Sequence, residues 1–358
     1  MKVRNETMRW MAALACATAL AACGGGGGGG GGTTETGSTG STAGTGNTDP
    51  TPPSTPPVPD ARSGDYVMYA GDARQYTLSL DFDAKTYHLV GNSQDLTGTL
   101  RESNTSGQFD LDVAGTATPA PNAPKFTWFN DTVVGGFRLP SGTVPFIAAR
   151  SFVTALADAA GTYNFLATIR DTAGPSDSLI FTGELLAGGT LRTCMDNGIF
   201  KMSLCPPASV ATATVTTSGD HFLADTGAGV YSFRIAKVGS EQVFLRASGS
   251  SGTTRRLQVG IPEATFTDGS FAGVNTHGDG TATTFTGTSY NANWNDGTSN
   301  VIRLGTVNTL GIGGPAGIVG INAGADGSFF AMHNSELMVM VAARNNAAWL
   351  GYVEFGKR

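Results

Sequence analysis

The sequence contains nine consecutive glycines, Gly24 to Gly32, at the start of a long stretch with very few apolar side chains. Thr, Ser and Gly residues follow them, and a proline-rich section extends to Pro59. Such a segment buries too little apolar surface to offset the entropy lost on ordering. We therefore expect residues 24–62 to form a flexible tether with a typical span of about 35 Å, from the coil relation of roughly 5–6 Å × √n. This confines the folded body to residues 63–358.

The residues before the tether have the three parts of an export signal. Three basic residues lie among the first nine, and the largely apolar run Met11–Ala22 follows them. As a helix this run would reach about 18 Å, well short of the roughly 30 Å hydrocarbon core of a bilayer. It leads into Leu20-Ala21-Ala22-Cys23, which resembles the lipobox of bacterial lipoproteins. The resemblance implies a signal peptide over residues 1–22, cleavage before Cys23, and attachment of diacylglycerol and further acyl chains such as palmitate to Cys23.

The same resemblance implies a location. Each buried methylene of an acyl chain contributes about 0.8 kcal/mol, so several chains hold a protein firmly at a membrane. In lipoproteins sorted like those of enteric bacteria, a residue such as Gly24 after the cysteine favours the outer membrane, facing the periplasm or the cell surface. Two alternatives stay open. The run Ala13-Leu14-Ala15-Cys16 is a looser version of the motif, and a plain secretory signal would leave Cys23 unmodified.

Beyond the tether, short apolar or alternating runs recur between Gly, Asn, Asp, Ser and Pro residues. Residues 76–82, 163–169 and 242–246 are examples, and such runs are typical of strands. Abundant Gly, Thr and Ser together with scarce charge favour strands and tight turns over helices. We therefore predict an all-β body of antiparallel meanders that form one or two barrels or sandwiches. Residues 147–159 stay ambiguous between helix and strand, and the apolar run 337–341 predicts a central strand covered on both faces.

Three short sequence markers each recur three times along the body. A Gly-x-aromatic triplet comes first, a Thr-Gly pair after an apolar residue comes second, and a phenylalanine before a turn comes third. The phenylalanines stand at intervals of 96 residues, at Phe137, Phe233 and Phe329. The markers predict three related repeats over about 64–150, 161–246 and 269–344. Chance echoes in a Gly- and Thr-rich β sequence are the alternative. Closing each meander into a barrel would remove its unpaired edges.

Part of the first repeat resembles a known family. Residues 76–100 contain Asp81-Phe82-Asp83-Ala84-Lys85 and Leu96-Thr97-Gly98-Thr99-Leu100. This stretch is similar to one hairpin of the surface-lipoprotein β-barrels related to transferrin-binding protein. The resemblance covers some 25 residues of the chain. It implies a barrel and assigns no binding residues.

Two cysteines remain in the body, Cys194 and Cys205. In an oxidising compartment two thiols this close in sequence are expected to pair. Two free thiols or a metal pair are the alternatives, but a metal site needs further ligands and no histidine lies near in sequence. The sequence therefore predicts a disulfide and no metal.

The strongest indication of catalysis is Asp225, in Leu223-Ala224-Asp225-Thr226-Gly227-Ala228. This stretch resembles the aspartic-protease loop, in which two carboxylates share one proton. A partner loop is required, and the nearest match, at Asp326, has its Gly and Ser in the wrong order. An Asp before Gly is also ordinary hairpin chemistry. The body has no His-Glu-x-x-His, Gly-x-Ser-x-Gly or phosphate-cradling motif, so we expect no cofactor and favour a protein that is not an enzyme.

Aromatic clusters offer the other candidate site residues. Trp128 lies beside Phe126 and Phe129, and Trp294 follows Tyr290. Such rings stack on sugars or anchor a protein partner, or they fill a barrel interior. The formal net charge is −6 and the body has no basic cluster larger than a pair such as Arg255-Arg256, so nucleic acid is not an expected partner. The sequence predicts a membrane-anchored envelope lipoprotein with a binding or structural role, the alternative being a barrel that binds a ligand or host protein.

Overall fold

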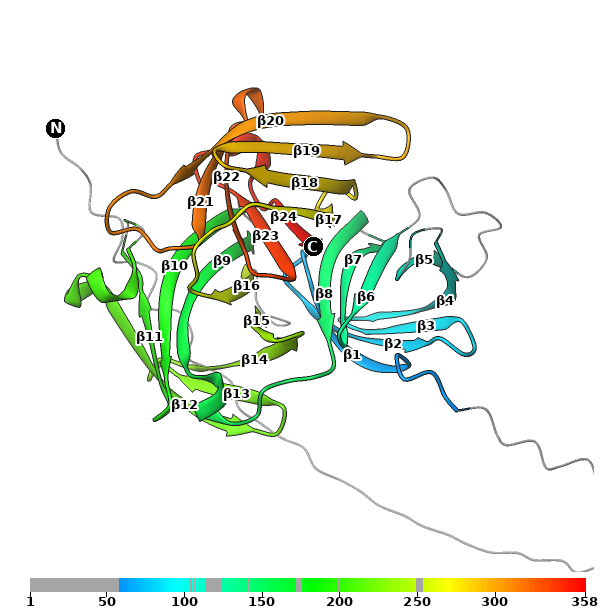
Figure 1. Cartoon of the computed structure of the whole chain (residues 1–358). Helices are drawn as coiled ribbons and strands as arrows, with labels where there is room; N and C mark the ends of the chain where they lie inside the picture. Colours follow the sequence, from blue (N-terminus) through cyan, green and yellow to red (C-terminus); the bar gives the residue numbers. More distant parts are fainter. Residues whose placement is uncertain are drawn as a thin grey trace, which may run out of the picture. The chain divides into compact units, whose positions relative to one another are not determined.

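The structure, a computed structural model, describes residues 58–358 apart from 104, 106, 114–123, 141, 172–175, 197, 199 and 249–253. Residues Pro59–Arg358 form one compact unit. It contains three closed barrels of eight antiparallel strands each, which follow one another along the chain (Figure 1). The all-β fold of antiparallel meanders predicted from the sequence is confirmed. There are three barrels, where the sequence left one or two barrels or sandwiches open.

In each barrel every strand pairs with the next along the chain, and the last strand pairs with the first. The first barrel comprises β1 (Gly64–Ala70), β2 (Gln75–Asp81), β3 (Thr86–Gly91), β4 (Gln94–Glu102), β5 (Gln108–Val113), β6 (Lys125–Phe129), β7 (Thr132–Leu139) and β8 (Gly142–Ala149). The second comprises β9 (Gly161–Asp171), β10 (Asp177–Leu186), β11 (Thr190–Cys194), β12 (Val210–Ser218), β13 (His221–Asp225), β14 (Val230–Val238), β15 (Glu241–Ser248) and β16 (Thr254–Pro262). The third comprises β17 (Gly269–Asn275), β18 (Gly280–Thr286), β19 (Ser289–Asn295), β20 (Asn300–Thr309), β21 (Ile318–Asn322), β22 (Ser328–His333), β23 (Leu337–Ala342) and β24 (Val353–Lys357).

Alternation along the strands sends every second side chain into a barrel. On β19, Tyr290, Ala292 and Trp294 are buried while the residues between them are exposed. In the second barrel, the ring of Phe165 stacks on Phe181 with centroids 4.9 Å apart. Each barrel interior is a hydrophobic core of its own.

A further hydrophobic core lies between the barrels and is shared by all three. It combines Ile147 of the first barrel with Leu245 of the second and Val339 of the third. Strand β23 gives alternate side chains to this shared core and to its own barrel interior, so all six of its residues are buried. This confirms the prediction of a covered strand at residues 337–341.

Polar and glycine contacts complete the junction of the barrels. The guanidinium of Arg170, on β9, donates to the carbonyl of Gly71 at 2.6 Å and to that of Gly351 at 3.0 Å. One side chain therefore links all three barrels. Strands β7 and β17 also approach closely, because a Cβ at Gly136 would lie 2.7 Å from the Val274 side chain. Any larger residue at Gly136 would push the first and third barrels apart.

The repeat markers agree unequally with the strand order. The Gly-x-aromatic triplet opens the first strand of every barrel, at β1, β9 and β17. The phenylalanine marker lies on the sixth strand of the second and third barrels but on the seventh of the first. In the second barrel the β11–β12 connection, residues 195–209, takes up length, so the sixth strand lies about as far from the barrel's start as the seventh strand does in the first barrel.

Helices are few in the described part of the chain. Residues 147–159, ambiguous in sequence, complete β8 and then form only the short helix α1 (Leu156–Ala159). Four single 3₁₀ turns are η1 (Met202–Leu204), η2 (Pro207–Ser209), η3 (Gly324–Asp326) and η4 (Ala347–Trp349). None of the helices within the described residues has the length and apolar character needed to span a bilayer.

Candidate functional site

The predicted cysteines fall in two groups. Cys23, its alternative Cys16, and the signal and tether through residue 57 lie outside the described residues. Cys194 and Cys205 form the predicted disulfide, which joins the end of β11 to the residue after η1. It therefore staples the long β11–β12 connection to the second barrel.

Asp225 is a turn residue, which was the alternative to the aspartic-protease loop. It ends β13 in an exposed hairpin, and its carboxylate accepts a hydrogen bond from the Gly227 N–H at 2.8 Å. Asp326, the near-match, lies on η3 in the third barrel and forms an ion pair with Arg303. The two carboxylates thus belong to different barrels and have different hydrogen-bond or ion-pair partners.

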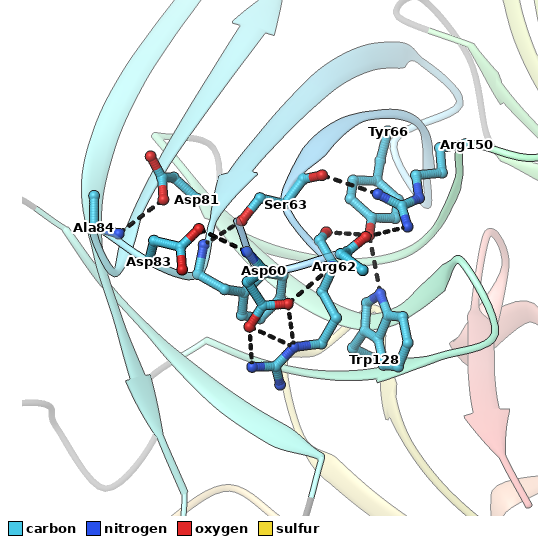
Figure 2. A network of polar contacts seen from close by, with 11 residues as sticks. Asp60, Arg62, Ser63, Tyr66, Asp81, Asp83, Ala84, Trp128 and Arg150 are labelled. Atoms are coloured by element: carbon cyan, nitrogen blue, oxygen red, sulfur yellow. Dashed lines mark hydrogen bonds and ion pairs between the residues drawn. The ribbon is translucent and has the colours of Figure 1, made fainter. Parts of the chain in front are cut away.

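Trp128 belongs to a polar network where the chain enters the first barrel (Figure 2). Its indole N–H donates to the Tyr66 hydroxyl at 2.9 Å, and that hydroxyl donates to the Arg62 carbonyl at 2.7 Å. Arg150 binds the same segment through the carbonyls of Ser63 and Ala61. Trp128 is half-buried and fixes the entry segment rather than standing free beside a groove.

An arginine covers the aromatic interior at this end of the first barrel. The Arg62 guanidinium lies over the ring of Phe82, 4.4 Å from its centroid, and pairs with Asp60 at 2.6 Å. This pairing and the backbone N–H of Arg62 lower the pKa of Asp60 to about 2. The charged groups at this end therefore have partners, and they hold the entry segment at the first barrel.

The third barrel differs because its interior contains a carboxyl group. Glu354, on β24, is fully buried. One of its oxygens accepts a hydrogen bond from the Tyr352 hydroxyl at 2.6 Å, and the other accepts one from Thr283 at 2.8 Å. Burial raises the pKa of Glu354, and these two hydrogen bonds oppose the rise.

Buried polar groups without partners surround this carboxyl. The hydroxyls of Tyr290 and Thr281 and the indole N–H of Trp294 make no hydrogen bond within the described residues, although all three side chains are at least nine-tenths buried. Thr281 lies directly opposite Trp294 in the β18–β19 pairing. Burial raises the pKa of the Tyr290 hydroxyl, and Trp294 is close enough to oppose this rise, as Thr281 does for the carboxyl of Glu354. Neither contact has the geometry of a formed hydrogen bond. Native interiors rarely leave such groups unpaired. Unpaired buried groups also occur on β9 and β10, at Asn164, Thr168 and Ser178, but among the described residues only those of the third barrel surround a fully buried carboxyl group, which marks it as the candidate site.

Aromatic rings and an arginine close the end of the site. Trp294 stacks on Tyr352 with centroids 5.5 Å apart, and Trp349 of η4 meets Trp294 edge-on at 5.3 Å. The Arg303 guanidinium lies over Trp294, 4.2 Å from the ring centroid, and over Trp349 at 5.2 Å. Trp349 is half-buried, whereas Trp294 is only 3% exposed. Trp294, a predicted site residue, is thus at the site but behind Trp349 rather than on the surface.

Sequence reasoning missed Glu354 and Arg303. A single acidic residue within the apolar run from Tyr352 to Phe355 was a signal for Glu354. Strand alternation, however, places Val353 and Phe355 on one face and Glu354 on the other, so the apolar pair would be assigned to the barrel interior. Val353 and Phe355 instead pack into the shared core, which turns Glu354 inward.

No protein-family model, curated protein or solved structure matches this chain. No group of three or more His, Cys, Asp or Glu side chains within the described residues is arranged to hold a metal ion.

Proposed function

We propose that this chain is a non-enzymatic binding protein of the bacterial envelope, anchored to the outer membrane by lipid on Cys23. The signal, the lipobox-like motif and the glycine tether support the anchor. The single observation that supports binding is the set of unpaired buried polar groups around Glu354. A purely structural barrel gains nothing from such groups, because each one costs stability unless something pairs with it.

A purely structural envelope protein is the second candidate. The core shared by the three barrels favours it, because a rigid body on a tether suits a spacer or scaffold. The hydrolase alternative has no such support, since the exposed Asp225 carboxylate is engaged in its own turn.

The anchor is tested with the full-length chain in a bacterial host that is fed an alkyne-tagged fatty acid. We expect the wild type to incorporate the label and to sediment with outer membranes. Cys23→Ala should lose the label and appear in the soluble fraction, whereas the matched variant Cys16→Ala should behave as wild type. Label lost only in Cys16→Ala, or never present, would refute the assignment to Cys23. Protease treatment of intact cells then reports which side of the membrane the body faces.

Binding and structural roles are separated by what the mature protein retains. A binding protein should hold a ligand or partner through purification in mild detergent, and native mass spectrometry detects either as added mass. If the protein is structural, deleting its gene should make cells sensitive to detergent or osmotic stress. Expression of Glu354 variants that still fold should then restore full resistance.

A further inference from the structure

The unpaired groups of the third barrel have a definite hydrogen-bonding character. The indole N–H of Trp294 and the Nε–H of Arg303 only donate, and neither has an acceptor in the described part of the chain. The hydroxyls of Tyr290 and Thr281 can donate or accept. A molecule that satisfies these groups must have oxygen atoms that accept hydrogen bonds.

These groups lie on adjacent strands and face one interior. The strand pairing places Thr281 opposite Trp294, and Thr283 opposite Ala292. The next pairing places Ala292 opposite Arg303. Thr283 also donates to Glu354, so the acid, the two threonines and the indole are contiguous. Ala292 is the smallest side chain in this row and stands between the polar groups.

Flat rings bound the same region. Trp294 and Tyr352 are nearly parallel, with an interplanar angle of 14°, and Trp349 stands across them at 79° to Trp294. Aromatic faces of this kind pack against the C–H faces of sugar rings and polyols as well as against other rings. Trp349 lies on the single turn η4 and is half-buried, and the exposed imidazole of His277 packs against its outer side, with ring centroids 4.7 Å apart.

We propose that the interior of the third barrel beneath Trp349 binds a small uncharged molecule bearing several hydroxyl oxygens, such as a polyol or a monosaccharide. This inference rests on the proposed binding role and names its ligand class. Ligand oxygens accept from Trp294 and Arg303, a ligand hydroxyl exchanges hydrogen bonds with Tyr290 and Thr281, and Glu354 lies beside them. Trp349 closes over the ligand.

A cationic ligand is the competing class, because aromatic cages and a carboxyl suit an ammonium group. Two observations favour the neutral class. The Arg303 guanidinium already lies over Trp294 and Trp349 and would repel a second cation. A cation also offers no acceptor to the indole N–H, which would stay unpaired.

The test uses the purified mature chain in detergent and saturation-transfer NMR with glycerol, glucose, N-acetylglucosamine and tetramethylammonium as probes. We expect transfer to at least one neutral probe and none to tetramethylammonium, which has a positive charge and no hydroxyl. Trp294→Phe keeps a ring but removes the N–H, and it should weaken binding of that probe at least tenfold. Tyr290→Phe should weaken it less. The matched control is Trp128→Phe in the first barrel, which should leave binding unchanged.

Thermal unfolding of each variant shows that it folds before its binding is measured. Absence of transfer to all neutral probes, transfer unaffected by Trp294→Phe, or transfer to tetramethylammonium alone would overturn the proposal. A crystal structure of the probe-soaked protein with only ordered water between Trp294 and Glu354 would do the same. The anchor experiments do not depend on these outcomes. If the protein binds a ligand elsewhere and none in the third barrel, this inference is refuted and the proposed binding function stands.

Discussion

In the first barrel, Arg62 lies over Phe82, and the indole N–H of Trp128 donates to Tyr66. In the third barrel, Arg303 lies over Trp294, whose indole N–H has no partner among the residues that the structure describes. The two ends combine the same kinds of side chain, an arginine over rings and a tryptophan beside a tyrosine. They differ in how completely their hydrogen bonds are formed.

The end of the first barrel is therefore closed by hydrogen bonds to its own chain, whereas the end of the third barrel contains donors and hydroxyls that remain unpaired within the described part of the chain. The entry segment supplies the acceptors in the first barrel, since the Arg62 carbonyl accepts from Tyr66 and the Ser63 carbonyl accepts from Arg150. No such segment reaches Trp294, Tyr290 and Thr281 among the described residues, and Glu354 lies beside them. A network that is only partly satisfied costs stability. Its presence around Trp294 and not around Trp128 is what the following predictions test.

The largest effect is expected from removing the acid. Glu354→Ala leaves the Tyr352 and Thr283 hydroxyls without their acceptor and opens a cavity, and we expect a loss of about 3 kcal/mol in the free energy of unfolding. Urea unfolding of the mature chain measures it. The control Glu354→Gln keeps the side-chain volume and an acceptor for one hydroxyl, while its amide N–H can donate to the other hydroxyl, so it should lose much less. A loss below about 1 kcal/mol for the alanine variant would contradict a stabilising network around Glu354.

A pH-dependent effect should follow from the burial of the same carboxyl. Because the pKa of Glu354 is raised in the folded protein, the native state binds its proton more tightly than the unfolded chain. Its contribution is complete below the unfolded pKa and is lost as the pH rises through the folded pKa. We therefore expect Glu354→Gln to gain in melting temperature relative to wild type as the pH rises above about 4.5, the ordinary value for Glu. The two curves should converge below that pH. Parallel melting curves across the range would show that the carboxyl is not perturbed.

Sequence periodicity was enough to predict the strands but not which side chains fill the third barrel. The strands, their antiparallel order and the pairing of Cys194 with Cys205 follow from short-range patterns. The burial of Glu354 does not follow from such patterns. Alternation along a strand assigns side chains to two faces, but it does not tell which face lies inside the barrel and which packs against its neighbours. Val353 and Phe355 face a core made by residues of all three barrels, and that long-range packing turned the acid inward. The interval of the phenylalanine marker was misleading in the first barrel for a similar reason, since equal spacing conceals unequal loops.

The smallest effect, and the most direct test of the comparison, comes from substituting the two tryptophans. Trp128→Phe removes a formed hydrogen bond to Tyr66 and should cost about 1 kcal/mol. Trp294→Phe removes an N–H that has no partner, so in the ligand-free protein its cost should be limited to the lost ring contacts or offset altogether. Urea midpoints of the two variants, measured side by side, give the difference. If Trp294→Phe costs more than the lost ring contacts account for, in protein freed of any bound molecule, its indole N–H has a partner already. The two ends would then be equivalent in their hydrogen bonding, and the third barrel would have no unpaired donor to offer a ligand.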